Sequence, residues 1–147
     1  MNSAISISTR FREARERAEL SHDEVASRMG LSPPCIWDIE SHEEEICNCY
    51  SVAQVQRICI VLGIQPRDLF GFEPVMAPLS ANELAAHIRE HCSSRDISFE
   101  QFEDAAGWEV TKSLAEPERF RQDYPIDGII DICGELGIAW QRFVESP

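Results

Sequence analysis

Two places in the sequence bring together residue types that bind metal ions. At the first, His87 and His91 lie four residues apart in a stretch with helical periodicity. This spacing can place two imidazoles on one metal ion. Cys92 follows directly, but no third ligand stands at a known spacing, and two surface histidines are the simpler interpretation.

At the second place, His42 precedes Cys47 and Cys49 and could form a zinc clip with them. The Cys-x-Cys spacing is tighter than the usual Cys-x-x-Cys knuckle, so we expect neither a metal nor another cofactor. Cys35 is a candidate redox sensor, because a helix N-terminus lowers the pKa of a thiol. A small residue standing in for serine or threonine is the alternative. No nucleophile elbow, phosphate-binding loop or dinucleotide glycine motif occurs in the sequence, and we expect no enzyme.

The charge balance restricts the partners of this chain. Its 147 residues include 26 acidic and 13 basic side chains, which give a net charge of −13 at pH 7. Both halves are acidic, with a net charge of −5 over residues 1–78 and −8 over residues 79–147. Such a field repels phosphate backbones and disfavours an anionic membrane surface. DNA binding would require that the basic residues gather on one face.

Composition and the N-terminal residues favour a cytoplasmic protein with no membrane partner. No apolar run approaches the roughly 20 residues that a membrane-spanning helix needs. The segment from Met1 to Arg10 lacks the basic start and the long apolar stretch of a signal peptide. In a reducing compartment the six cysteines would be free thiols.

The elements that would position these residues are helices, because strand signals are nearly absent. Ser21-His22-Asp23-Glu24 is a capping box, and Gly30 suits the left-handed stop of the helix that it begins. Ser32 and Pro33 begin the next helix. The stretch 41–50 is expected to be a loop, and the stretch 71–80, which holds two prolines, a linker. We predict helices over about 10–18, 21–30, 32–40 and 51–62, and one last turn over 66–70.

The second half repeats this pattern. Ser98-Phe99-Glu100-Gln101 is a second capping box 77 residues after the first, and Gly107 follows Gly30 at the same offset. Leu62-Gly63-Ile64 recurs as Leu136-Gly137-Ile138 at an offset of 74. We therefore predict an all-α protein of two tandem five-helix units, a duplicated architecture. The predicted boundaries are 1–71 for the first unit, 72–80 for the linker and 81–147 for the second unit.

Four motifs of the first unit stand at spacings that characterise a known family. They are Arg10-Phe11-Arg12-x-x-Arg15, Leu20-Ser21-His22-x-Glu24-Val25-Ala26-x-x-Met29-Gly30-Leu31-Ser32, Ile36-x-x-Ile39-Glu40 and Val55-x-x-Ile58-x-x-x-Leu62-Gly63-Ile64. With them the stretch 9–70 resembles the lambda-repressor-like (Cro-type, XRE) helix-turn-helix domain. The second unit keeps only the framework and resembles a degenerate copy.

The resemblance implies a DNA-binding transcriptional regulator. In such a protein the third helix of the unit enters the major groove, and groups around it contact phosphates. The residues that the resemblance assigns to DNA are Arg10, Arg15, His22, Arg28 and Ser32 for phosphates, and Pro33, Pro34, Cys35, Trp37 and Asp38 along the third helix.

The sequence departs from the family where bases would be read. Pro33 and Pro34 have no side-chain donor, so bidentate reading of guanine or adenine is unavailable there. The following loop carries Glu43-Glu44-Glu45, and a carboxylate near a phosphate is repulsive. A second hypothesis is therefore an acidic helix-turn-helix scaffold that has lost DNA binding and acts as an adaptor, antitoxin-like or immunity-like module. DNA, a protein partner and a homodimer stay open as partners.

Overall fold

Serine side chains begin both of the helices for which the sequence predicts a capping box. The Glu24 N–H donates to Ser21 Oγ at 3.1 Å, and the Ser21 N–H donates to Glu24 Oε1 at 3.1 Å. Ser98 and Gln101 make the same reciprocal pair at 3.0 and 2.8 Å. Each box pairs two backbone amides that the first helical turn would otherwise leave unsatisfied. Both predicted capping boxes are thus confirmed.

The computed structural model describes residues 6–146, and this part of the chain is all-α, with no β-strand. Residues 1–5, which belong to the segment without signal-peptide character, lie outside that range, as does residue 147 at the end of the predicted second unit. None of the described helices is long and apolar enough to cross a membrane. The helices are α1 (Ile7–Arg17), α2 (His22–Met29), α3 (Pro33–Ser41), α4 (Glu45–Cys49), α5 (Val52–Leu62), α6 (Pro66–Phe70), α7 (Ala81–Arg95), α8 (Phe99–Ala106), α9 (Thr111–Ala115), α10 (Arg119–Gln122), α11 (Ile126–Leu136) and α12 (Gln141–Val144).

The short helix α4 lies within the stretch that the sequence predicts as a loop. Its N-cap, Glu44, makes no side-chain capping hydrogen bond, so the sequence carries no local signal for the start of this helix. Ile46, its second residue, is 1% exposed, and α4 packs against α11 from the far half of the chain. Tertiary burial of one isoleucine therefore accounts for a helix that local propensity does not predict.

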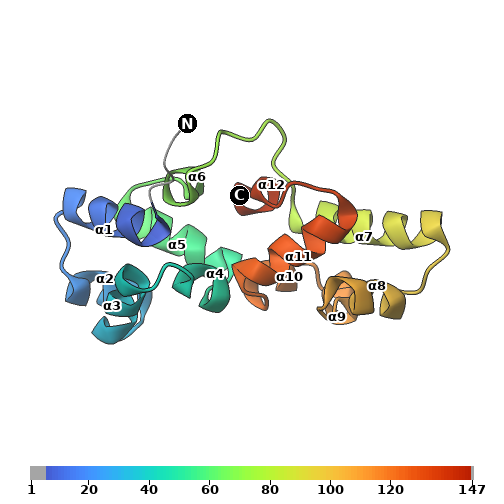
Figure 1. Ribbon diagram of the computed structural model, residues 1–147, viewed down its shortest axis with the longest axis horizontal. Coiled ribbons are helices and arrows are strands. Elements are labelled where there is room, and N and C mark those ends of the chain that lie inside the picture. Colours follow the sequence, from blue (N-terminus) through green and yellow to red (C-terminus); the bar gives the residue numbers. More distant parts are fainter. Residues whose placement is uncertain (1–5, 147) are drawn as a thin grey trace.

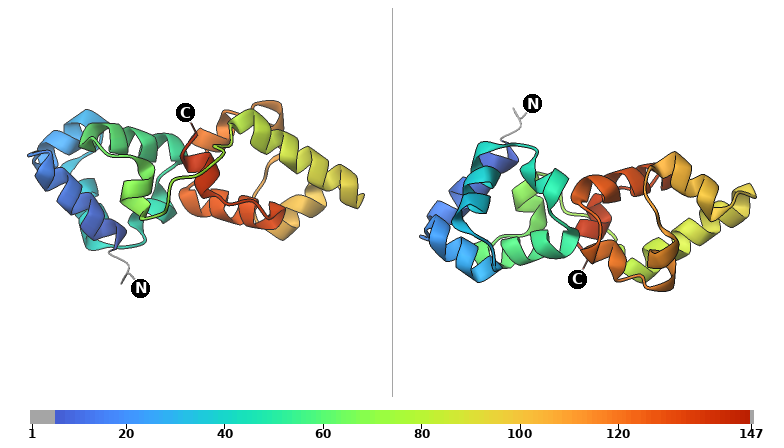
Figure 2. Two further views of the ribbon diagram at one scale, coloured as in Figure 1. Left: turned by 90° about the horizontal axis from the view of Figure 1, so that it is seen from above. Right: turned by 90° about the horizontal axis from the view of Figure 1, so that it is seen from below.

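The helices form two lobes along one long axis. Figure 1 shows α1–α6 in one lobe and α7–α12 in the other, with α2 and α3 along the same edge of the molecule as α8 and α9. Figure 2 shows the narrow waist where the lobes meet and the non-helical segment that links α6 to α7. The α2–α3 and α8–α9 pairs therefore lie along one edge of an elongated body, one pair in each lobe.

Contacts across the waist join the lobes. Ser51 and Pro125 form an isolated antiparallel bridge, and the Ile126 N–H donates to the Tyr50 carbonyl at 3.0 Å. The Arg121 side chain, 7% exposed, donates through Nη1 to the side-chain oxygen of Gln56 at 2.8 Å. The buried apolar residues of both lobes belong to one hydrophobic cluster. The waist is thus packed core rather than a flexible hinge.

Candidate functional site

The turn between α2 and α3 has the geometry that the sequence predicts. Gly30 closes α2 with φ +70°, a left-handed conformation that glycine adopts without steric cost. The Leu31 N–H then reaches back to the Ala26 carbonyl at 2.8 Å. Val25 and Ala26 are fully buried, and α2 packs closely on α3. The apolar side of α3 is thereby fixed, and its other side is turned outward.

The outward side of α3 begins with three residues that offer few hydrogen-bond donors. Pro33 occupies the first helical position and is half-buried, and Pro34 is exposed. Ser32 makes no capping bond, and its hydroxyl lies 3.4 Å from the Cys35 thiol. Between Ser32 and Cys35 the available side-chain donors are therefore one hydroxyl and one thiol.

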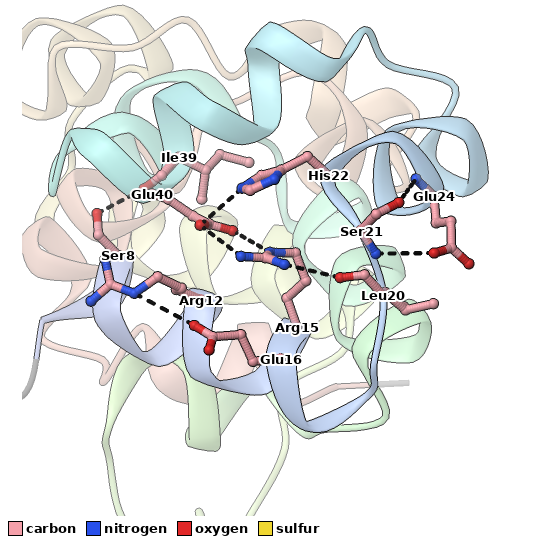
Figure 3. A network of polar contacts seen from close by, with 10 residues as sticks. All are labelled: Ser8, Arg12, Arg15, Glu16, Leu20, Ser21, His22, Glu24, Ile39 and Glu40. Carbon is pink, nitrogen blue, oxygen red and sulfur yellow. Dashed lines mark hydrogen bonds and ion pairs between the residues drawn. The ribbon is translucent and has the colours of Figure 1, made fainter.

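Glu40, on α3, holds two of the five predicted phosphate-contacting side chains. The Arg15 guanidinium donates to both carboxylate oxygens, at 2.6 and 3.2 Å, and His22 Nε2 lies 3.1 Å from Oε1 (Figure 3). Arg15 also donates to the Leu20 carbonyl at 2.9 Å. The side chains of Glu40 and Arg15 are only 6% and 12% exposed. Hydrogen bonding to Glu40 raises the pKa of Arg15 above its ordinary value, against the opposing effect of burial.

This network joins α1, α2 and α3 at one buried carboxylate. Glu40 belongs to the motif Ile36-x-x-Ile39-Glu40, and its sequence context alone assigns it no function of its own. Its partners stand 25 and 18 residues away, so no local spacing pairs them. The sequence feature that points to this role of Glu40 is an acidic residue directly after a buried isoleucine, at the end of the helix that faces α1.

His22 also makes a ring contact on its outer side. Its imidazole stacks on the Trp37 indole, with ring centroids 4.0 Å apart and planes 12° apart. Trp37 remains 56% exposed despite this contact. The imidazole is therefore bonded to Glu40 through Nε2 and covered by an indole on one face, and the indole itself is presented to solvent.

Arg10 and Arg28 lie apart from this network. Arg10 Nη1 donates to the Asp68 carbonyl at 3.3 Å, and its guanidinium packs against Gly71 just after α6. Arg28 is exposed near the end of α2, and its carbonyl accepts a hydrogen bond from Arg57 at 3.1 Å. The structure thus brings Arg15, His22 and Trp37 together, and places Arg10 at the other end of α1.

Exposed acidic side chains lie on α2, on α3 and in the turn that follows α3. Asp23, Asp38 and Glu44 are exposed. Glu43 is exposed too, but its Oε1 accepts the backbone N–H of Ile7 at the start of α1. The carboxylate of Glu43 therefore has a structural role at the positive end of the α1 dipole.

In the second lobe, the Glu103 carboxylate of α8 accepts hydrogen bonds from the backbone N–H groups at the start of α9. Its Oε2 accepts the Val110 N–H at 2.6 Å, and the Thr111 N–H and hydroxyl at 3.1 Å each. Burial alone would raise the pKa of Glu103, but these hydrogen bonds outweigh it and hold the pKa below the ordinary value of 4.5. The start of α9 thus presents a carboxylate where an anion-binding helix would present free amides.

The thiols and histidines gather into no metal site in the part of the chain that the structure describes, where no group of three or more ligand side chains occurs. His91 instead packs edge-on against Phe102, with ring centroids 5.5 Å apart. Burial raises the pKa of Cys47 to about 11, with smaller contributions from Asp127 and Glu43. All six cysteines have free thiols.

Comparisons with known proteins return no relative for this chain: no family model, no curated protein and no solved structure matches it.

Proposed function

We propose that the chain consists of two tandem copies of one helix-turn-helix-like unit, each about as long as predicted, arranged as an internal dimer. Helices α1–α6 correspond in order to α7–α12, and the two capping boxes and left-handed glycines fall at matching places. The waist supports the same correspondence. Ser51 and Pro125, which form the bridge, stand 74 residues apart, the offset of the Leu-Gly-Ile repeat.

The helix contacts between the two lobes also come in matching pairs. Helix α5 packs on α10, and α11, the counterpart of α5, packs on α4, the counterpart of α10. Reciprocal contacts of this kind are typical of a two-fold dimer interface. Each unit would then have six helices rather than the five predicted, because α4 and its counterpart α10 are additional.

We infer further that this scaffold binds a protein with a basic surface, and that its α2–α3 side does not serve DNA. The observation that carries this inference is the Glu40 network. With Arg15 and His22 bonded to a buried carboxylate, two of the five expected phosphate contacts are committed inside the fold. Phosphate affinity depends on the number of cations that reach the backbone, and the net charge of −13 acts against it.

The outward side of α2 and α3 fits a cationic protein surface. Trp37 offers a half-exposed aromatic face, on which an arginine or lysine side chain can stack. Asp38 is exposed beside it in the sequence, and Asp23 and Glu44 add negative charge on neighbouring elements. Tryptophan is enriched among the residues that dominate protein interfaces. Charge complementarity therefore favours a partner rich in arginine or lysine.

DNA binding remains the second candidate, because the α2–turn–α3 geometry and the exposed Arg28 and Ser32 favour it. The two proposals differ in what Asp38 does. If α3 faces DNA, Asp38→Asn removes a repulsive charge and tightens binding; if α3 faces a basic protein, the same change weakens binding.

The test compares Asp38→Asn with Asp104→Asn, an equal charge change at an exposed site on α8. Each form is titrated at low salt with a random-sequence DNA duplex and with an arginine-rich helical peptide. We expect no duplex binding by any form, and weaker peptide binding by Asp38→Asn than by the parent or Asp104→Asn. Duplex binding that Asp38→Asn strengthens would overturn the proposal and favour the DNA-binding regulator.

A further inference from the structure

A cavity of about 470 Å³ opens between α5, α6 and the end of α12. Its apolar walls come from Ile60, Ile64, Pro66 and Val144, and Gln56 contributes an amide. Ile60 is 79% exposed, an unusual position for a large aliphatic side chain on a helix that is otherwise well packed. The volume lies in the range of about 300 to 1,000 Å³ that small-molecule sites occupy.

The corresponding place in the other lobe is filled by aromatic rings. In the repeat alignment proposed above, Pro66 corresponds to Trp140 and Ser146 to Phe72, each 74 residues apart. The Trp140 ring meets Phe70 edge-on at 5.3 Å and Phe72 edge-on at 5.8 Å. Where one side of the waist has an indole against two phenyl rings, the other side has a proline, a valine and a serine. The open cavity is therefore the space that a flat aromatic group occupies across the waist.

Glu145 is the charged side chain that lines the cavity. This side chain is only 7% exposed, and Arg67 Nη1 lies 3.5 Å from its Oε1. Within residues 6–146 no donor hydrogen-bonds that oxygen. The Cys59 thiol also lines the cavity, and its pKa is raised to about 12, first by burial and then by the charges of Asp68 and Glu145. A buried carboxylate oxygen that accepts no hydrogen bond can accept one from an ammonium group but not from an anion.

We propose that this cavity binds a small organic cation with a flat aromatic ring, in chemical class an arylethylamine. The ring lies between Ile60 and Pro66, in the place that the indole of Trp140 takes on the other side. The ammonium group lies toward Glu145 and competes with Arg67 for the carboxylate. One ligand then contacts both the apolar wall of the cavity and the Glu145 carboxylate.

The test measures the affinity of the full chain for three probes by calorimetry at low salt: tryptamine, indole and indole-3-acetate. We expect tryptamine to bind tightest, indole to bind about two- to fivefold more weakly, as the loss of a partly exposed ion pair implies, and indole-3-acetate more weakly still. Glu145→Gln should remove most of the preference for tryptamine over indole.

Two further variants test the place of binding. Pro66→Trp copies Trp140 and should abolish binding of all three probes, whereas Pro74→Trp, the same change in the linker, should leave it unchanged. Ile60→Ala changes an exposed side chain, leaves the fold intact and should weaken all three probes severalfold. Absence of tryptamine binding at millimolar concentration would overturn the proposal. Equal affinity for the cation and the anion, or affinities that neither Pro66→Trp nor Ile60→Ala changes, would overturn it as well.

Discussion

Replacing either member of the Arg15–Glu40 pair should destabilise the fold far more than replacing an exposed ion pair. Glu40→Leu leaves the Arg15 guanidinium, 12% exposed, without the carboxylate that neutralises it, and leaves His22 without its bond. Arg15→Met leaves Glu40, 6% exposed, with His22 alone. Removing one partner of a buried pair costs about 3–5 kcal/mol, because the remaining charge is desolvated and unpaired.

The double variant Arg15→Met/Glu40→Leu removes both charges and should cost much less than the sum of the single changes. We expect a coupling free energy of about 1.5–3 kcal/mol for this pair. Arg12 and Glu16 provide a matched control at 3.8 Å, with side chains 47% and 62% exposed. Their coupling should stay below about 0.5 kcal/mol.

Urea unfolding of the parent, the two single variants and the double variant measures these free energies. With a slope of about 1–3 kcal/mol per molar urea, each single change should lower the midpoint by roughly 2 M. Slopes that stay constant across the set would show that the unfolded state is unchanged. A cost below about 0.5 kcal/mol for Glu40→Leu would show that the Glu40 carboxylate does not hold Arg15 and His22, which would then be free for another partner.

Three further experiments test separate parts of the structure. Gly30→Ala should cost about 1 kcal/mol in urea unfolding, because φ is +70° while the space around an added Cβ is open; no cost would contradict the left-handed stop. Glu103 has a lowered pKa in the folded state, so its stabilisation is present above the ordinary value of 4.5 and lost as the pH falls through the folded value. The melting temperature of the parent should therefore fall more between about pH 6 and about pH 3 than that of Glu103→Gln, and parallel losses would contradict this. Cys59, buried and with a pKa raised to about 12, should resist alkylation near neutral pH until denaturant is added; mass spectrometry showing rapid labelling in the native state would contradict its burial.

The helices with strong local end signals could be predicted from the sequence. Ser21 and Ser98 each stand three residues before a side chain that completes a capping box, and Gly30 and Gly107 close the same helices. These signals join residues within one helical turn, so they can be recognised in the sequence without knowledge of the tertiary structure. Helix α4 has no such signal and depends on the burial of Ile46 against the other lobe.

The candidate site could be predicted only in part, because its decisive contacts are distant in the chain. The motif spacing indicated that α3 turns one side outward, and Pro34, Trp37 and Asp38 are exposed there. The motif spacing did not indicate that Glu40, 25 residues after Arg15, would accept hydrogen bonds from the Arg15 guanidinium. The ring contact between His22 and Trp37 likewise depends on the crossing of two helices.

The most direct test of the proposed partner class is an NMR titration of the ¹⁵N-labelled chain at low salt, with a random-sequence DNA duplex in one series and an arginine-rich helical peptide in the other. We expect the peptide to shift the Trp37 indole resonance and the backbone amides of Cys35 and Asp38 in a saturable manner, and the duplex to leave them unchanged. A duplex that shifts these same resonances to saturation, together with a peptide that shifts none of them, would contradict the proposed partner class.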